Sequence, residues 1–232
     1  MRKKFAITSN VKRFTAAVNG IMQAPPGIDR MALVYGDPGL GKTETCAWWV
    51  NHHGQNAAYV PTKKLMSGRW LLEEIVMELG EAPAYRTCDL FRQAVEILAG
   101  TDRLLILDEA DYLTRDKAVL ETIRDIHDAT RSPILLVGME KADTKLRRHR
   151  HLWRRFSEVE RFKPLTMEDI AAVFEQICEY PVDSSAVEAV HGFGSVTVSL
   201  LYRLCRFMEE SVIKHGLDHV TADCVFPGQR SK

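Results

Sequence analysis

The sequence lacks a long apolar run, a signal-peptide core and an excess of charge of either sign. No stretch approaches the roughly 18 apolar residues that a membrane-spanning helix needs, so we expect no contact with a membrane. The basic start of the chain is not followed by the apolar core of a secretory signal. Lys and Arg together number 31, as do Asp and Glu, so the net charge is zero. This balance excludes a surface that attracts nucleic acid over its whole area, and any such binding requires a local basic patch.

Paired cysteines are also missing. The five cysteines stand singly and no two form a CxxC motif, so their spacing predicts neither a zinc site nor a disulfide framework. Scattered single cysteines are typical of a reducing compartment. Because signal and membrane segments are absent as well, the sequence predicts a cytoplasmic protein.

Apolar runs and amphipathic segments alternate along the first two thirds of the chain. The apolar runs predict strands at 31–35, 57–60, 104–107 and 134–137, with a fifth at 158–162. Helical segments separate them, which favours an α/β fold with a parallel five-stranded sheet between helices. After Pro164 the sequence predicts helices alone, the first opened by Thr166 and Asp169 at capping-box spacing. We therefore expect an α/β domain at 1–164 and a small C-terminal helical subdomain at 165–232.

The first predicted strand runs into a glycine-rich loop that continues into a helix. The loop fits the phosphate-binding pattern of Gly, four residues, then Gly-Lys-Thr. Its main-chain N–H groups are expected to surround a polyphosphate, its lysine to reach the β- and γ-phosphates, and its threonine hydroxyl to ligate Mg²⁺. A chance glycine-rich turn is the alternative, and the flanking strand and helix argue against it. The residues predicted to bind ATP are Gly36, Asp37, Pro38, Gly39, Leu40, Gly41, Lys42 and Thr43, with Thr43 also a metal ligand.

The apolar run at 104–107 leads directly into two acidic residues, Asp108 and Glu109. We assign Asp108 to the support of Mg²⁺ and Glu109 to the general base that activates the attacking water. The alternative is a helix start that is rich in acidic residues, Asp111 included, because the helix dipole favours them there. Since a phosphate loop precedes these acids, hydrolysis of ATP is the stronger interpretation.

These motifs, followed by a fourth strand, a basic segment and a helical C-terminal part, resemble the AAA+ ATPases. Segment 8–14 and block 34–43 are similar to the DNA transposition ATPases, the family of Mu phage transposition protein B, and the resemblance covers about residues 5–215. It implies an AAA+ P-loop fold with a C-terminal helical lid, and ATP and Mg²⁺ as cofactors. It also implies a homo-oligomer or filament on double-stranded DNA that delivers target DNA to a transposase. By the same resemblance, Asn10 and Val11 are expected to contact the nucleotide.

AAA+ ATPases use an arginine from a neighbouring subunit for hydrolysis. Segment 145–155 contains six Lys and Arg and no acid, and by position Arg155 resembles that arginine, with Arg154 as second choice. A guanidinium suits the role because it stabilises charge spread over the γ-phosphoryl group. A solvated basic face or a DNA-contacting patch is the alternative. Where the family's lid carries a further arginine, this chain has Thr197, which predicts slow hydrolysis.

The loop after the second predicted strand carries Lys63, Lys64 and Arg69 beside small residues. In the resembling ATPases, basic residues of such loops line the inside of the assembly and follow DNA phosphates. We therefore predict that these three residues bind DNA, mostly without regard to sequence. An ordinary solvated loop is the alternative.

The combined features predict an ATP-dependent, DNA-binding regulator of transposition whose slow ATP hydrolysis is stimulated by DNA. An AAA+ ATPase of the helicase-loading or origin-recognition type is the first alternative. A P-loop small-molecule kinase is the second, and the basic segment and the helical lid argue against it. A filament protein that does not hydrolyse ATP is the third.

Overall fold

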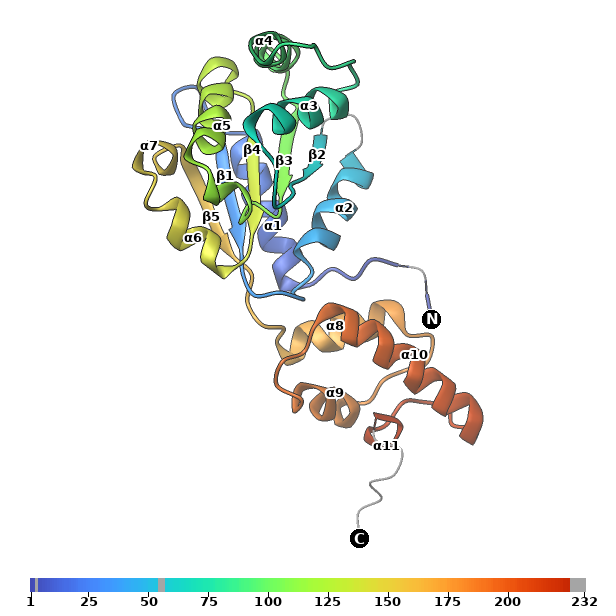
Figure 1. Ribbon diagram of the computed structural model, residues 1–232. Helices are drawn as coiled ribbons and strands as arrows, with labels where there is room; N and C mark the ends of the chain where they lie inside the picture. Colours follow the sequence, from blue (N-terminus) through green and yellow to red (C-terminus); the bar gives the residue numbers. More distant parts are fainter. Residues whose placement is uncertain (3, 54–56, 226–232) are drawn as a thin grey trace. The chain divides into compact units, whose positions relative to one another are not determined.

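The computed structural model of the protein describes residues 1–2, 4–53 and 57–225. Five strands form one sheet in the order β2-β3-β4-β1-β5, and all neighbouring strands are parallel (Figure 1). The predicted α/β fold with a parallel five-stranded sheet is confirmed. The strands are β1 (Met31–Tyr35), β2 (Ala57–Pro61), β3 (Leu104–Asp108), β4 (Ile134–Gly138) and β5 (Phe156–Arg161).

Burial explains why the sequence predicts most of these strands. Every residue of β3 and β4 is buried, because helices cover both faces of the sheet. The edge strand β5 contains no fully buried residue and carries Ser and Glu between its apolar residues. Its hydrophobic pattern is therefore the weakest of the five, and its observed start lies two residues before the predicted one.

The helices α1 (Ser9–Met22) and α2 (Lys42–His53) cover one face of the sheet (Figure 1). The other face packs against α3 (Gly68–Glu78), α4 (Thr87–Leu98) and α5 (Lys117–Thr130). Alternate strand residues such as Leu33, Leu105 and Leu136 share one buried cluster with those three helices. Three short helical elements are not predicted, because one or two turns give too little hydrophobic periodicity. They are η2 (Leu113–Arg115), α6 (Glu140–Leu146) and α7 (Arg150–Trp153).

The C-terminal part contains α8 (Met167–Ile177), α9 (Ser184–His191), α10 (Val198–His215) and α11 (Ala222–Val225). The predicted capping box at the start of α8 is confirmed, since the side chains of Thr166 and Asp169 each accept the other residue's main-chain N–H. The side chains of Cys178 and Cys205 contact each other, and their Cα atoms are 6.0 Å apart. Separated by 27 residues, they become neighbours only through the packing of α8 against α10.

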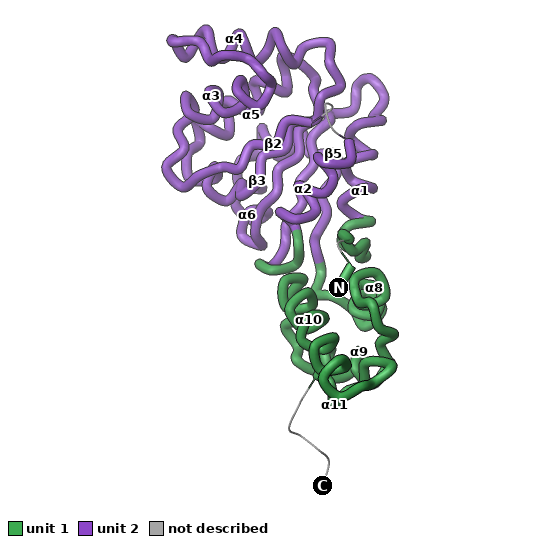
Figure 2. Tube along the Cα trace, turned by 90° about the vertical axis from the view of Figure 1, so that its right-hand side faces the viewer, with its two compact units in different colours: residues 1–12, 38–41, 163–232 green, residues 13–37, 42–162 purple. Residues whose placement is uncertain are grey.

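The chain divides into two compact units (Figure 2). One comprises residues 13–37 and 42–162, and the other combines residues 1–12 and 38–41 with the chain from residue 163 onward. Within the second unit, Ser9 N donates to the Asp169 carboxylate at 2.6 Å, which joins the start of α1 to α8. The simpler division at residues 164 and 165 stays a prediction, and its last residues, 226–232, lie outside the described part. No helix in the described ranges is long and apolar enough to cross a membrane.

Candidate nucleotide-binding site

Residues 36–43 connect the end of β1 to α2, which begins at Lys42. Gly36 has φ 155°, and a Cβ atom placed there would lie 2.7 Å from the main-chain oxygen of Phe162. Gly41 has φ 85°, in the left-handed region that side chains disfavour. The glycines thus permit a main-chain path that a side chain would block. A loop that curls around a phosphate requires such a path.

Lys42 lies within this loop. Its Nζ donates to the main-chain oxygens of Gly36, at 2.9 Å, and Asp37, at 2.8 Å. Burial lowers the pKa of Lys42, while the negative charges of Asp108 and Glu109 act in the opposite direction. The loop lysine and the acid pair are therefore electrostatically coupled. Thr43 is exposed in the first turn of α2.

Asp108 ends β3 and is nearly fully buried. Its Oδ1 accepts a hydrogen bond from Glu109 N at 2.8 Å, and its Oδ2 accepts one from the Tyr59 hydroxyl at 2.8 Å. Glu109 has φ 57°, a left-handed conformation that is uncommon outside glycine. The Thr62 hydroxyl donates to the main-chain oxygen of Glu109 at 2.8 Å and supports this turn.

Burial raises the pKa of Glu109, and the neighbouring charges of Asp108 and Asp111 raise it further. A carboxylate with a raised pKa accepts a proton more readily, which suits a general base. Asp111 also accepts a hydrogen bond from Met139 N at the end of β4. A Cβ atom on Gly138 would lie 2.9 Å from the same carboxylate. The acid loop is thereby fixed to the neighbouring strand.

The residues present fit ATP and Mg²⁺. The Thr43 hydroxyl and the Asp108 carboxylate are hard oxygen donors, which Mg²⁺ prefers. The glycine conformations and the Lys42 ammonium suit a polyphosphate. Because parallel strands end at the same edge of a sheet, the loop after β1 and the acids after β3 share one edge. The ligand-binding roles of the individual residues stay predictions.

Asn10 and Val11, in the first turn of α1, are buried. The Asn10 side-chain amide donates to the main-chain oxygen of Lys163 at 2.8 Å, and its carbonyl oxygen accepts from Lys163 N at 3.0 Å. Val11 is 4% exposed. Asn10 therefore holds the segment that follows β5. The predicted contact of Asn10 and Val11 with a nucleotide is not tested by these bonds.

The start of α10 contacts the phosphate loop. Val198 N donates to the main-chain oxygen of Gly39 at 3.0 Å. Thr197 caps α10, since its hydroxyl accepts from Leu200 N at 3.2 Å. No cationic side chain stands at this capping position, where the family resemblance implies an arginine.

Two of the three predicted DNA-binding residues pair with acids of the same chain. Lys63 Nζ lies 2.9 Å from the Glu74 carboxylate, and Arg69 Nη2 lies 2.7 Å from Glu73. Lys64 is exposed and forms no ion pair with any other residue that the structure describes. The uncompensated charge of this loop therefore resides on Lys64.

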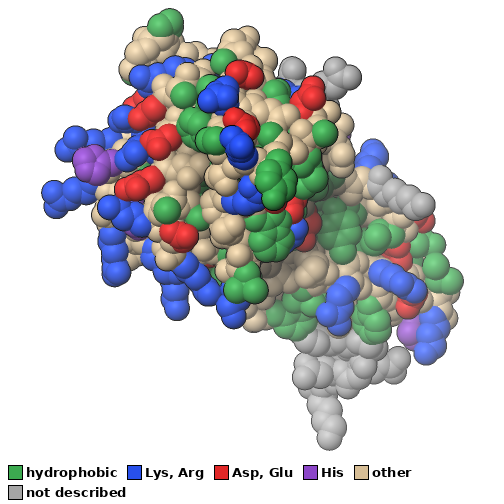
Figure 3. Space-filling view, turned by 45° about the horizontal axis from the view of Figure 1, so that its top comes forward, with side chains coloured by type: hydrophobic (Ala, Val, Ile, Leu, Met, Phe, Trp, Pro, Cys, Tyr) green, Lys and Arg blue, Asp and Glu red, His purple; other side chains and the backbone are tan. Residues whose placement is uncertain are grey.

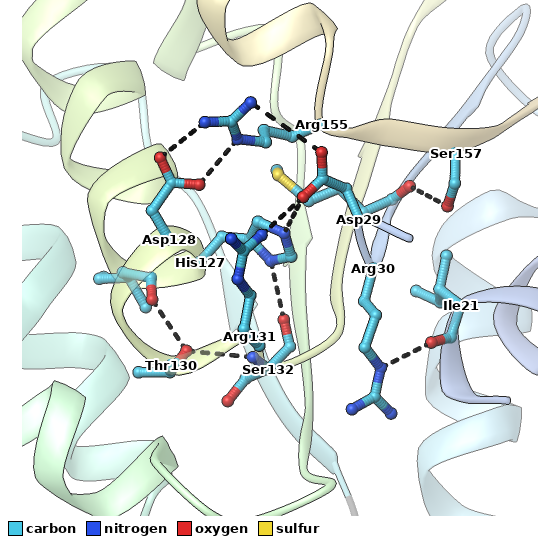
Figure 4. A network of polar contacts seen from close by, with 12 residues as sticks. Ile21, Asp29, Arg30, His127, Asp128, Thr130, Arg131, Ser132, Arg155 and Ser157 are labelled. Carbon is cyan, nitrogen blue, oxygen red and sulfur yellow. Dashed lines mark hydrogen bonds and ion pairs between the residues drawn. The ribbon is translucent and has the colours of Figure 1, made fainter. Parts of the chain in front are cut away.

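Arg155 belongs to a network of ion pairs (Figure 4). Its Nε and Nη2 donate to the two Asp128 carboxylate oxygens at 2.7 and 3.0 Å. The guanidinium holds the pKa of Asp128 below its usual value. Asp29 lies 3.9 Å from Arg155 Nη1 and accepts a hydrogen bond from Arg131 at 2.8 Å. Arg154 is exposed, and its side chain has no hydrogen bond or ion pair within the described ranges.

The rest of the basic segment lies on α6, on α7 and between them. Arg147 pairs with Asp143 at 2.9 Å. Arg148 and Arg150 are exposed, and neither pairs with an acid among the residues described. Figure 3 shows Lys and Arg side chains gathered at one margin of the molecule around a histidine. A local basic surface therefore exists on a chain of zero net charge.

Tyr59, Asp128 and Asp29 are not predicted from the sequence, and Asp111 is predicted only as part of an acid-rich helix start. A polar tip on an aromatic residue inside a short apolar strand is the one available signal for Tyr59. The three aspartates come from different elements, and only the fold brings them to their partners.

A family model described as an AAA domain matches residues 28–146. The chain is 33% identical over 119 residues to the Mu-like prophage FluMu DNA transposition protein B of Haemophilus influenzae. These aligned residues cover 50% of this chain and 40% of that protein. It is 32% identical over 137 residues to the ATP-dependent target DNA activator B of Escherichia phage Mu, with coverages of 58% and 42%. The chain thus spans about two fifths of the length of these curated relatives.

Solved structures show a similarity of fold. The ORC2 protein of Aeropyrum pernix, described in ADPNP–ADP complexes, aligns with a TM-score of 0.70 at 15% sequence identity. The alignment covers 97% of this chain and 69% of the ORC2 chain. The whole described architecture, including the C-terminal helices, therefore has a counterpart in a known fold.

Proposed function

The chain belongs to the AAA domain family, and we propose that it is an ATPase that binds double-stranded DNA in its ATP-bound state and regulates transposition. The observation that carries the proposal is the placement of loop 36–43 and the pair Asp108 and Glu109 at one edge of a parallel sheet. The names of the relatives, a DNA transposition protein and a target DNA activator, support the biological context.

The proposal assigns a role to each residue of the site. Lys42 and the loop N–H groups bind and orient the phosphates, and Thr43 and Asp108 hold the metal. Mg²⁺, when bound, neutralises the charge that develops on the phosphates. Glu109 accepts the proton of the water that attacks the γ-phosphorus, and its raised pKa favours that transfer.

We propose that the site is completed by an arginine of a neighbouring copy. Arg155 would have to leave two hydrogen bonds to Asp128 to reach a neighbour, whereas exposed Arg154 needs no such change. We therefore favour Arg154 for contact with the neighbour's nucleotide and Arg155 for stability.

Substitution of the two arginines separates these roles. Arg154→Ala is expected to keep ATP binding and thermal stability and to lose most hydrolysis, at least roughly tenfold. Arg155→Ala leaves Asp128 without its partner and is expected to lower the melting temperature. Phosphate release and thermal denaturation measure both effects. Wild-type turnover in Arg154→Ala, with hydrolysis lost only in a stably folded Arg155→Ala, would restore the original assignment to Arg155.

We propose that DNA binds through the loop after β2, with Lys64 as the main contact. The double variant Lys63→Ala and Lys64→Ala is expected to bind duplex DNA more weakly and with a salt dependence shallower by about one unit of slope. Lys64→Ala alone should reproduce most of the effect, because Lys63 already pairs with Glu74. Filter binding at several salt concentrations measures the slope. An unchanged slope in the double variant removes this loop from the DNA site.

The proposal extends to a homo-oligomer or filament on DNA, a cytoplasmic location and a transposase as partner. Membership of the AAA domain family argues against a small-molecule kinase. The helicase-loading and origin-recognition alternative shares the site chemistry, so pull-downs with a transposase and with a helicase discriminate between them.

Electron microscopy with duplex DNA tests the assembly. A non-hydrolysable ATP analogue should give DNA-bound rings or filaments, and ADP should not. A monomer that ignores DNA in both nucleotide states contradicts the proposed function.

A further inference from the structure

Tyr59 stands beside the acid that is assigned to the metal. In the register of β2 and β3, Tyr59 is opposite Ile106, and Pro61 is opposite Asp108. Side chains two residues apart in a strand share a face, so Asp108 is the diagonal neighbour of Tyr59. An aromatic side chain is long enough to reach that position, and the Tyr59 hydroxyl lies 2.8 Å from Asp108 Oδ2.

The Asp108 carboxylate is held on both oxygens. Glu109 N donates to Oδ1 and the Tyr59 hydroxyl donates to Oδ2. The residue is only 3% exposed, so bulk water does not compete for these positions. Each carboxylate oxygen accepts more than one hydrogen bond, and capacity therefore remains for a metal-bound water.

The Tyr59 hydroxyl is a side-chain donor to the Asp108 carboxylate. Burial raises the pKa of Tyr59 far above its usual value, and the negative charge of Asp108 raises it further. The other donor to the carboxylate is a main-chain N–H, so Tyr59 supplies the only side-chain hydrogen bond to Asp108 within the described ranges.

We propose that Tyr59 is a positioning residue for Mg²⁺, whose hydroxyl fixes the Asp108 carboxylate in the orientation that supports the metal. The proposal rests on the proposed function, since it presumes a nucleotide–metal complex at this edge of the sheet. Removal of the hydroxyl frees one carboxylate oxygen and leaves it buried without a donor. Loss of such a supporting hydrogen bond typically weakens metal affinity by 10-fold or more.

Tyr59→Phe tests this role, with Tyr85→Phe as the matched control. Tyr85 is 90% exposed, and its hydroxyl bonds to no other described residue. Binding of a fluorescent ATP analogue is followed at fixed protein concentration while Mg²⁺ is titrated from a chelated start. The Mg²⁺ concentration at half saturation should rise roughly tenfold in Tyr59→Phe and stay at the wild-type value in Tyr85→Phe.

The possible outcomes are distinct. An unchanged Mg²⁺ midpoint in Tyr59→Phe overturns the positioning role. This holds also if the melting temperature of the ligand-free protein falls, because a residue with a purely structural role lowers stability without changing the Mg²⁺ midpoint. A raised midpoint with an unchanged melting temperature supports it. Failure of the wild-type protein to bind the analogue at any Mg²⁺ concentration refutes the proposed function itself.

Discussion

Lys42→Ala is expected to weaken ATP binding by at least roughly a hundredfold. The ammonium lies within loop 36–43, where it donates to Gly36 and Asp37, and these are the positions from which it would contact phosphate oxygens. A hydrogen bond to a charged partner contributes about 1.5–3 kcal/mol, and two such bonds to phosphates account for the expected factor. Titration of a fluorescent ATP analogue measures the affinity.

The fold should tolerate this substitution. Burial lowers the pKa of Lys42, which means that the folded loop disfavours the charge, so its removal should not destabilise the protein. Lys117→Ala, an exposed position on α5, is the matched control and should bind ATP normally. Wild-type affinity in a folded Lys42→Ala variant would show that the loop does not hold phosphates.

Glu109→Gln is expected to lower ATP hydrolysis by about 10²- to 10⁴-fold while ATP binding is retained. The amide cannot accept the proton of the attacking water at neutral pH. Glutamine keeps the size of the side chain and has the same main-chain requirements as Glu109, whose φ is 57°, so the turn after β3 should persist. Phosphate release gives the rate, and the fluorescent analogue gives the affinity.

The same variant should prolong the ATP-bound state on DNA. Co-sedimentation with duplex DNA should therefore persist after ATP addition for longer than with the wild-type protein. Glu121→Gln on α5 removes an exposed carboxylate and serves as the control. Turnover near the wild-type rate in Glu109→Gln would assign the general base to another residue.

The sheet was predictable because its inner strands are buried on both faces. The apolar runs that form β1, β3 and β4 predict strands of a parallel sheet covered on both faces, since only such a sheet buries these runs completely. Edge strand β5 is half-exposed and mixed in composition, so its apolar pattern places the start of the strand two residues too late. The helices α6 and α7 have seven and four residues and show no usable period.

The chemistry of the site was predictable only where it is local in sequence. Loop 36–43 and the acids after β3 are contiguous motifs. The Tyr59 hydroxyl reaches Asp108 across 49 residues of sequence, and Arg155 reaches Asp128 across 27. Such pairs depend on strand register and helix placement, which a single sequence does not specify. The same limit applies to the contact between Cys178 and Cys205.

The rate of ATP hydrolysis with and without duplex DNA tests the central claim most directly. The proposal of an ATPase whose nucleotide cycle acts on DNA predicts a slow basal rate that rises several-fold when duplex DNA is added. The Lys42→Ala variant defines the background in the same assay. A rate that DNA does not change, in a wild-type preparation that binds ATP, would contradict the claim.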